Sequence, residues 1–212
     1  MNAIPTFGVF IPTRGYVWHE TAAAMGSAAP TYVKCTTGVV DARHLIVRTF
    51  LKTDWDICVM LDDDIIPPPD WRRLVEHVAV GKADVCAAVC PVALEGTVFL
   101  PNVFLRDDSL EKKYRLSLDY IRETGLQEVD AVGTGMIAIH RRVLTDKAMK
   151  DPFKADFTSG AGEDVSFCYR AKRARYKVCV DFDIWCDHLV QVHANGMANQ
   201  YMKLLSEGEL HA

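Results

Sequence analysis

The stretch WDICVMLDDDIIPPPD, residues 55–70, decides the fold, because an apolar, strand-like run ends in it abruptly at a group of acids. Residues 57–61 are apolar or β-favouring and are long enough for one buried strand. Three carboxylates follow directly, Asp62, Asp63 and Asp64, and a hydrophobic core would not tolerate them. We therefore expect these acids at the carboxyl end of a strand, where α/β sheets bind their ligands.

The residues after the acids predict a turn and then a helix. Three consecutive prolines, residues 67–69, cannot continue a strand or a helix. Asp70 is a residue type that caps helix N-termini, and apolar side chains recur after it at helical spacing. The predicted core-facing side of this helix comprises Trp71, Leu74, Val75 and Val78.

Strands and helices alternate in the segments before this stretch. The pattern predicts strand, helix, strand and helix, at residues 7–11, 16–24, 31–36 and 41–51. Asp41 would cap the second of these helices. Such alternation predicts an α/β fold with a mostly parallel central sheet flanked by helices.

The second half of the chain contains further strands and helices. The expected elements are an apolar strand at 83–92, an irregular or edge strand at 97–105, a helical spacing of Tyr114, Leu118 and Ile121, a strand at 129–140 kinked at Gly133 and Gly135, a partly helical segment at 141–150, a loop at 154–162, a helix at 163–175, a strand at 176–182, an irregular segment at 189–199 and a short terminal helix. No internal repeat or linker divides the chain, so we expect one domain over residues 1–212.

Composition and charge narrow the class of protein. Of the 212 residues, 50% are hydrophobic and 25% charged, as in ordinary soluble globular domains. No stretch approaches the roughly 18 apolar residues of a membrane span, and the N-terminus lacks the features of a signal peptide. We therefore expect a soluble, cytoplasmic protein. Its formal charge of −4 provides no general attraction for polyanions.

Seven cysteines occur without a C-x-x-C pair, and several of them lie in apolar runs. This distribution favours buried free thiols in a reducing compartment over a disulfide framework or a zinc site.

The acid triplet has two interpretations. In an extended segment Asp62 and Asp64 point to the same side and Asp63 to the other, because side chains alternate. Two like charges so close favour a cation between them, and Mg²⁺ characteristically takes one or two carboxylates together with substrate phosphates. The alternative is a solvated acidic turn in which Asp63 or Asp64 accepts hydrogen bonds from nearby backbone N–H groups.

A second acidic pair, Glu163 and Asp164, follows Gly162 in the first turn of the predicted helix. Acids at this position are favoured by the helix dipole. Because a glycine-containing loop precedes them, one of these acids could instead act as the general base for an acceptor hydroxyl.

Other polar residues are individually ambiguous. His188 follows a predicted strand and is either an ordinary hydrogen-bonding residue or a ligand for Mn²⁺ and similar ions. Arg14, Asp41 and Arg43 lie at the carboxyl ends of early strands or the start of the next helix. Together they would line the rim where a nucleotide binds a parallel sheet.

The order of several sequence blocks resembles the glycosyltransferases of the GT-A fold, particularly the family 2-like enzymes. The blocks are IPTRG at 11–15, DARHL at 41–45, VMLDDDIIPP at 59–68, GTGMIAIHRRVL at 133–144, GEDVSFCYRAKRARYKVCVD at 162–181 and DHL at 187–189. The resemblance covers most of residues 7–188. It implies a single Rossmann-like nucleotide-diphospho-sugar transferase domain, with a nucleotide-binding part at about 1–92, an acceptor-side part at about 93–199 and a tail at 200–212.

The resemblance also implies residue roles. Asp62, Asp63 and Asp64 match the D-x-D motif, which would contact the nucleotide sugar. The implied metal ligands for Mn²⁺ or Mg²⁺ are Asp62, Asp64 and His188. The residues implied to bind the donor further include Pro12, Thr13, Arg14, Asp41, Arg43, Gly133 and Gly135. Asp164, with Glu163, would deprotonate the acceptor. The implied reaction is transfer of a sugar from a UDP- or GDP-sugar to an acceptor hydroxyl, with inversion at the anomeric carbon.

Several alternatives stay open at this level. The chain could be a retaining GT-A enzyme, a sugar-phosphate nucleotidyltransferase, or a non-catalytic module that binds a metal or a sugar. A hydrolase with Asp62 as a phosphorylated nucleophile lacks the expected hydroxyl and lysine partners. The acceptor is open between a sugar, a lipid-linked carrier, a protein side chain and a modified DNA base. The sequence leaves the oligomeric state open, a homo-oligomer included.

Overall fold

The computed structural model describes residues 5–94, 98–108, 114–116, 123–156 and 162–189. The predicted irregular segment at 189–199 falls outside these ranges beyond its first residue, as does the predicted terminal helix. Among the described residues, no helix is long and apolar enough to cross a membrane.

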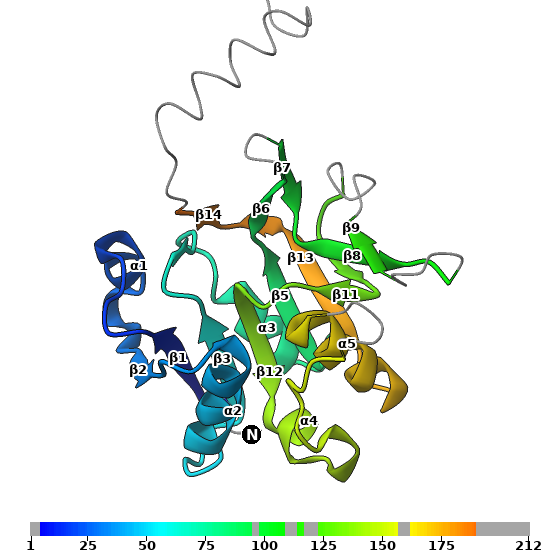
Figure 1. Cartoon of the computed structure of the whole chain (residues 1–212), viewed down its shortest axis with the longest axis horizontal. Helices are drawn as coiled ribbons and strands as arrows, with labels where there is room; N and C mark the ends of the chain where they lie inside the picture. The colour runs from blue at the N-terminus through cyan, green and yellow to red at the C-terminus, as the bar shows by residue number, and fades with distance from the viewer. Residues whose placement is uncertain (1–4, 95–97, 109–113, 117–122, 157–161, 190–212) are drawn as a thin grey trace, which may run out of the picture.

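A seven-stranded sheet forms the centre of the structure, with strand order β10-β13-β5-β12-β3-β1-β2 (Figure 1). Its strands are β1 (Phe7–Thr13), β2 (Thr31–Lys34), β3 (Ile57–Leu61), β5 (Val85–Val89), β10 (Leu126–Glu128), β12 (Met136–His140) and β13 (Val178–Trp185). β12 pairs antiparallel with β3 and β5, and β10 pairs antiparallel with β13, whereas the other pairs are parallel. The predicted α/β fold is confirmed, and its sheet is mixed, with β10 and β12 running against the other strands.

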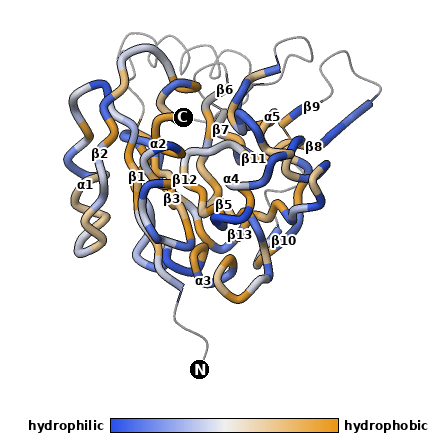
Figure 2. Tube along the Cα trace, turned by 90° about the horizontal axis from the view of Figure 1, so that it is seen from below, coloured by the Kyte–Doolittle hydropathy of each residue, from blue (hydrophilic) through white to orange (hydrophobic). Residues whose placement is uncertain are grey.

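Helices cover both faces of this sheet. They are α1 (His19–Ala24), α2 (Val39–Phe50), α3 (Arg73–Ala79), α4 (Arg141–Thr145) and α5 (Glu163–Arg173), with 3₁₀ turns at Gly26–Ala28 and Lys147–Met149. One apolar cluster joins α2, α4 and α5 to the sheet, and a second cluster contains the buried residues of α3. Apolar residues concentrate along the inner strands, as Figure 2 shows. The sheet is therefore the middle layer of three.

Three small sheets accompany the large sheet, at the top and on the right of Figure 1. The first contains β11 (Ala131–Val132), β8 (Val103–Arg106) and β9 (Tyr114–Leu116), in that order. The second pairs β6 (Pro91–Leu94) with β7 (Val98–Pro101). The third pairs β4 (Ile65–Ile66) with β14 (Asp187–His188), which places His188 opposite Ile65, one residue after the acid triplet.

The central prediction, a buried strand at residues 57–61 that ends at the acids, is confirmed by β3. The helix predicted from residue 163 and the broken strand around Pro101 are confirmed as well. Trp71, Leu74, Val75 and Val78 are buried, as their spacing predicts.

Both predicted aspartate caps are wrong. α2 begins two residues before Asp41, because Gly38 precedes it with φ of +151°, a region that favours glycine. α3 begins at Arg73, after a turn in which the Arg73 N–H donates to the Asp70 carbonyl oxygen. The Asp70 carboxylate instead lies 3.5 Å from the Arg73 guanidinium.

Two further sequence predictions are corrected by strand pairing. Tyr114 is not helical: it lies in β9 opposite Arg106 of β8, so pairing with the neighbouring strand replaces the expected helix. Leu118 and Ile121 lie outside the described residues. The strand predicted at 129–140 is divided between β11 and β12, which belong to different sheets, and the Gly133–Gly135 corner connects them.

Replacing Gly8 with alanine is expected to destabilise the fold. A Cβ atom at this buried position of β1 would lie 2.0 Å from the Trp55 ring, so the indole would have to move. We expect the free energy of unfolding to fall by about 1–3 kcal/mol, measured by urea denaturation. Adding Trp55→Leu, which shortens the obstructing side chain, should reduce the cost of the alanine. An unchanged unfolding midpoint for Gly8→Ala would contradict the packing of Trp55 on β1.

Candidate functional site

The acid triplet lies at the carboxyl end of β3 and is held by its backbone. The Asp62 N–H donates to the Gly135 carbonyl oxygen at 2.8 Å, and the Trp18 N–H donates to the Asp63 carbonyl oxygen at 3.2 Å. A Cβ atom on Gly135 would lie 3.0 Å from the Cys90 sulfur. The missing side chain of Gly135 therefore lets the backbone just before β12 pack against Cys90, in the position where its carbonyl group holds the start of the triplet.

Asp62 forms an ion pair with a buried arginine. The Arg43 Nη2 lies 2.6 Å from the Asp62 Oδ1, and the Arg43 side chain is only 1% exposed. Burial raises the pKa of Asp62 to about 6, while the charge of Arg43 and its hydrogen bond act in the opposite direction. The Nε and Nη1 atoms of Arg43 are buried and have no hydrogen-bond partner among the residues that the structure describes. Arg43 thus supplies a fixed positive charge behind the acid triplet.

Asp64 faces His188 across the β4–β14 pair. The His188 Nε2 lies 3.5 Å from the Asp64 Oδ2, and its Nδ1 lies 2.8 Å from the Pro91 carbonyl oxygen. A carbonyl oxygen only accepts hydrogen bonds, so Nδ1 must carry the hydrogen and a neutral ring leaves Nε2 with a lone pair towards Asp64. A favourable contact between the Nε2 lone pair and the Asp64 carboxylate then requires a proton or a cation between these two groups. The contact with Asp64 correspondingly raises the pKa of His188.

The side chains around Asp64 and His188 provide only some of the ligands that a divalent cation needs. Within the described ranges, no three His, Cys, Asp or Glu side chains gather closely enough to hold a metal. Of the three predicted metal ligands, Asp64 and His188 lie together, whereas Asp62 is turned towards Arg43. A carboxylate and an oriented imidazole fit a Mn²⁺ or Mg²⁺ ion whose other ligands are waters and phosphate oxygens of a substrate.

A cleft of about 180 Å³ adjoins the triplet on one side. It lies at the ends of β1 and β2 and the start of α2. Its lining comprises Pro12, Thr13, Arg14, Cys35, Gly38, Val39, Ala42, Asp62, Asp63 and Asp64. The predicted donor-binding residues Pro12, Thr13 and Arg14 are therefore brought beside the acids. Asp41 lies in the first turn of α2, where it is exposed, and lines neither this cleft nor the next.

A second cleft of about 170 Å³ lies on the other side of Asp62. Val39 and Asp62 line both clefts, so the two adjoin at these residues. The lining of the second cleft comprises Val39, Arg43, Asp62, Ile65, Cys90, Val92, Asn102, Phe104, Gly133, Thr134, Gly135, Glu163, Asp164 and His188. The second cleft thus brings together the Gly133–Gly135 corner, His188 and the acidic pair, which are far apart in the sequence.

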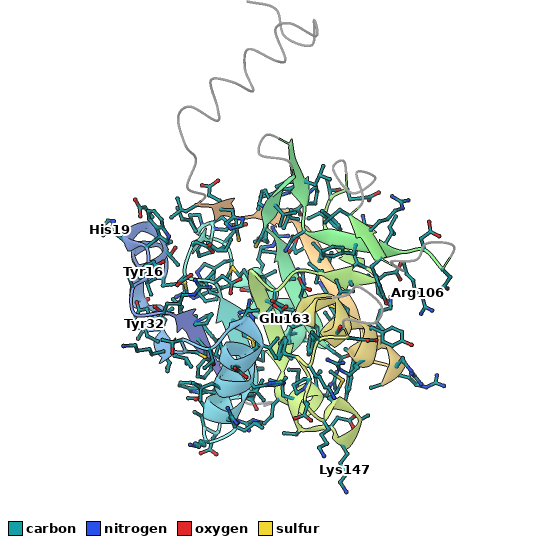
Figure 3. All side chains as sticks on the ribbon, viewed as in Figure 1. Tyr16, His19, Tyr32, Arg106, Lys147 and Glu163 are labelled. Atoms are coloured by element: carbon teal, nitrogen blue, oxygen red, sulfur yellow. The ribbon has the colours of Figure 1, made fainter. Side chains whose placement is uncertain are left out.

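The acidic pair begins α5 at the edge of this second cleft, near the middle of the molecule in Figure 3, where Glu163 is labelled. The Asp164 Oδ1 accepts a hydrogen bond from the Val165 N–H at 2.7 Å. Burial raises the pKa of Asp164, helped by the nearby charge of Glu163 and opposed by that same hydrogen bond and by Arg43. A carboxylate with raised proton affinity beside a cleft has the properties of a general base.

The sequence analysis did not predict Asn102 as a residue of the second cleft. Asn102 is 2% exposed, its Oδ1 accepts from the Cys90 N–H, and its Nδ2 donates to the Gly133 carbonyl oxygen. Its only sequence signal is a polar residue inside the apolar run VFLPNVFL, residues 98–105.

Comparison with solved structures identifies the type of fold. No protein-family model and no curated protein matches the sequence. The crystal structure of A197 from STIV matches with a TM-score of 0.62 and 21% identity, over 88% of this chain and 86% of that chain. GalNAc-T7, solved with UDP, GalNAc and Mn²⁺, matches with a TM-score of 0.61 and 11% identity, over 91% of this chain and 45% of its own. The fold is that of the nucleotide-diphospho-sugar transferases.

The same fold extends to a nucleotidyltransferase. CMP:2-keto-3-deoxy-manno-octonic acid synthetase, complexed with CTP, has a TM-score of 0.51 and 13% identity, over 97% of this chain and 100% of that chain. At these identities the likeness shows the GT-A-type fold and leaves the reaction to the residues of the site.

Proposed function

We propose that this chain is a metal-dependent glycosyltransferase that moves a sugar from a UDP- or GDP-sugar to an acceptor hydroxyl. The observation that carries the proposal is the junction of two clefts at Asp62, with the Asp64–His188 pair beside it. A nucleotide sugar has three parts in a row, namely nucleoside, diphosphate and sugar. The first cleft, the acid triplet and the second cleft form a matching series.

Each part of the donor has a set of residues to hold it. The nucleoside occupies the first cleft against Pro12, Thr13 and Arg14, which come from the predicted nucleotide-binding part of the chain. The sugar occupies the second cleft, whose lining includes Gly133 and Gly135 of the acceptor-side part. The diphosphate lies between them, beside the D-x-D acids.

Asp64 and His188 would hold a Mn²⁺ or Mg²⁺ ion, and Asp62 would join them through the oxygen that does not pair with Arg43. Such an ion supplies Lewis-acid stabilisation of the charge that develops on a departing nucleoside diphosphate. Arg43 lies behind Asp62 and adds a fixed positive charge on the same side. The departing diphosphate is thereby stabilised by the part of the site that also binds it.

Glu163 and Asp164 act on the acceptor hydroxyl. Asp164 accepts the proton of the acceptor hydroxyl as that hydroxyl attacks the anomeric carbon and the bond to the diphosphate breaks. Burial, with a smaller contribution from the charge of Glu163, raises the pKa of Asp164. A base on the opposite side of the sugar from the leaving group gives inversion. The retaining outcome is the alternative within the same fold, and the configuration of the product at the anomeric carbon distinguishes the two.

A nucleotide-release assay tests the proposal. The protein is incubated with Mn²⁺ and a panel of UDP-glucose, UDP-galactose, UDP-N-acetylglucosamine and GDP-mannose, and free UDP or GDP is measured. Release from one donor, abolished by EDTA and restored by Mn²⁺, is the expected result. Metal-dependent binding of a donor without release, even with added sugar acceptors, would favour a non-catalytic module.

A nucleotidyltransferase is the second candidate, because the CTP-bound synthetase matches over its full length. Such an enzyme consumes a nucleoside triphosphate and releases pyrophosphate. Supplying CTP, UTP or GTP with sugar phosphates or acidic sugars and measuring pyrophosphate separates the two reactions. Pyrophosphate release without diphosphate release from any nucleotide sugar would replace the first proposal by the second.

Replacing His188 with alanine is expected to weaken metal binding. The variant removes the oriented Nε2 atom that faces Asp64, so the Mn²⁺ concentration for half-maximal activity should rise at least about tenfold. A Mn²⁺ titration of the release assay measures this change. His19→Ala is the control, because this histidine is exposed on α1. An unchanged Mn²⁺ dependence would remove His188 from the metal site.

A further inference from the structure

The side-chain amide of Asn102 is fixed on two sides by backbone groups. Its Oδ1 lies 2.8 Å from the Cys90 nitrogen, which can only donate, and its Nδ2 lies 3.2 Å from the Gly133 oxygen, which can only accept. The reversed orientation of the amide would lose both hydrogen bonds. The two partners therefore determine which atom is oxygen and which is nitrogen.

This arrangement leaves one hydrogen of the amide unused. An asparagine NH₂ group has two hydrogens, and Gly133 takes one of them. The second hydrogen has no acceptor among the residues that the structure describes, although the side chain is 2% exposed. A buried donor without a partner is unfavourable, so this position favours a ligand or a water that accepts from it.

The cleft around Asn102 restricts what that ligand can be. Asn102 lines the second cleft next to the apolar side chains of Ile65, Val92 and Phe104, with the acidic pair also in the lining. Acids disfavour an anionic ligand, whereas apolar walls with isolated polar groups suit a sugar ring, which has apolar faces and hydroxyl edges.

We propose that Asn102 donates its remaining amide hydrogen to a hydroxyl oxygen of the transferred sugar and so takes part in selecting that sugar. This inference rests on the proposed glycosyl transfer. In the proposed binding mode the nucleoside lies in the first cleft and the diphosphate beside the acid triplet, and Asn102 lines only the second cleft. Asn102 therefore contributes to binding of the sugar and not to binding of UDP or GDP alone.

Asn102→Asp removes the one hydrogen in question with little other change. In its neutral acid form the new carboxyl keeps an oxygen to accept from the Cys90 N–H and an O–H to donate to the Gly133 carbonyl oxygen. Burial and the facing carbonyl oxygen favour that neutral form. No hydrogen is then left for the cleft. Thermal unfolding and circular dichroism verify that the variant folds.

The readout compares binding of a nucleotide sugar with binding of its nucleotide. For the donor that the release assay selects, we expect Asn102→Asp to weaken nucleotide-sugar binding roughly 3–10-fold and to leave UDP or GDP binding unchanged. Monodeoxy analogues of the same donor identify the hydroxyl. Removing the contacted hydroxyl should weaken binding to the wild type by the same factor and have no effect on the variant.

A second measurement needs no variant. The chain has four asparagines, Asn2, Asn102, Asn195 and Asn199, so selective ¹⁵N-asparagine labelling gives few side-chain amide signals. The Asn102 NH₂ signal, assigned through its loss in Asn102→Asp or by residue-pair labelling, should shift on adding the nucleotide sugar and stay unchanged with the nucleotide alone.

The outcomes separate this inference from the proposed function. A wild type that neither binds nor cleaves any nucleotide sugar contradicts the proposed function itself. An active wild type in which every monodeoxy donor loses affinity equally in both proteins overturns the role of Asn102. The same conclusion follows if the Asn102 amide signal does not respond to the sugar, or if Asn102→Asp weakens UDP and UDP-sugar binding equally.

Discussion

Asp64→Ala is expected to reduce nucleotide release by at least about 10²–10³-fold, because it removes the carboxylate that faces His188. The remaining imidazole would bind a divalent cation weakly, and the diphosphate would lose the cation that holds it. Both turnover and metal-dependent nucleotide binding should therefore fall together. Calorimetric titration of UDP or GDP, with and without Mn²⁺, measures the binding, and the release assay measures the turnover.

Two features sharpen the Asp64 experiment. Asp54→Ala is a control, because Asp54 is exposed and precedes β3, at the opposite end from the triplet. The backbone of Asp64, whose carbonyl oxygen accepts from the Leu189 N–H at 2.8 Å, is retained in the variant. Nucleotide binding that keeps its full Mn²⁺ dependence in Asp64→Ala would show that the cation is held elsewhere.

Asp164→Asn is expected to remove sugar transfer while leaving donor binding intact. The asparagine oxygen can still accept from the Val165 N–H, so the start of α5 is preserved. The variant cannot take up the proton of the acceptor hydroxyl, and a rate loss of roughly 10²–10⁴-fold follows. The Kd of the donor, measured by calorimetry, should change little. Equal losses of donor binding and transfer would show that Asp164 holds the donor instead.

Glu163→Gln is the matched variant of the neighbouring acid. Both acids line the second cleft, and burial raises the pKa of Asp164. We expect the glutamine to lower the transfer rate far less than Asp164→Asn does. A larger loss in Glu163→Gln would exchange the roles of the two acids.

The pH profile gives an independent check on Asp164. A base must be ionised to accept a proton, so the transfer rate should be lost as the pH falls through the pKa of Asp164. Because burial raises that pKa, the loss begins at a higher pH than for an ordinary aspartate. The pKa of His188 is also raised, and its protonated ring cannot bind a cation, so both proteins lose activity through this group at acidic pH. At saturating Mn²⁺, the rate of Asp164→Asn should therefore fall less with decreasing pH than the wild-type rate does. A wild-type rate that is flat down to pH 4 would contradict the assignment.

The sequence by itself determined the elements whose signals are local. An apolar run that ends at three acids and three prolines can only be a strand ending at the surface, and β3 has the predicted bounds. The acids that begin α5 follow from the same kind of local pattern. Local preference was insufficient at Tyr114, where pairing with β8 replaced the expected helix by a strand.

Only the tertiary structure decided which side chains meet. The ion pair of Arg43 with Asp62, the approach of His188 to Asp64 and the two hydrogen bonds of Asn102 all join residues that are 12 or more positions apart. Each contact depends on strand order and register, above all on β12 between β3 and β5 and on β14 against β4. Strand pairing of this kind is set by packing of the whole core, because no short segment carries the energy that selects its partner.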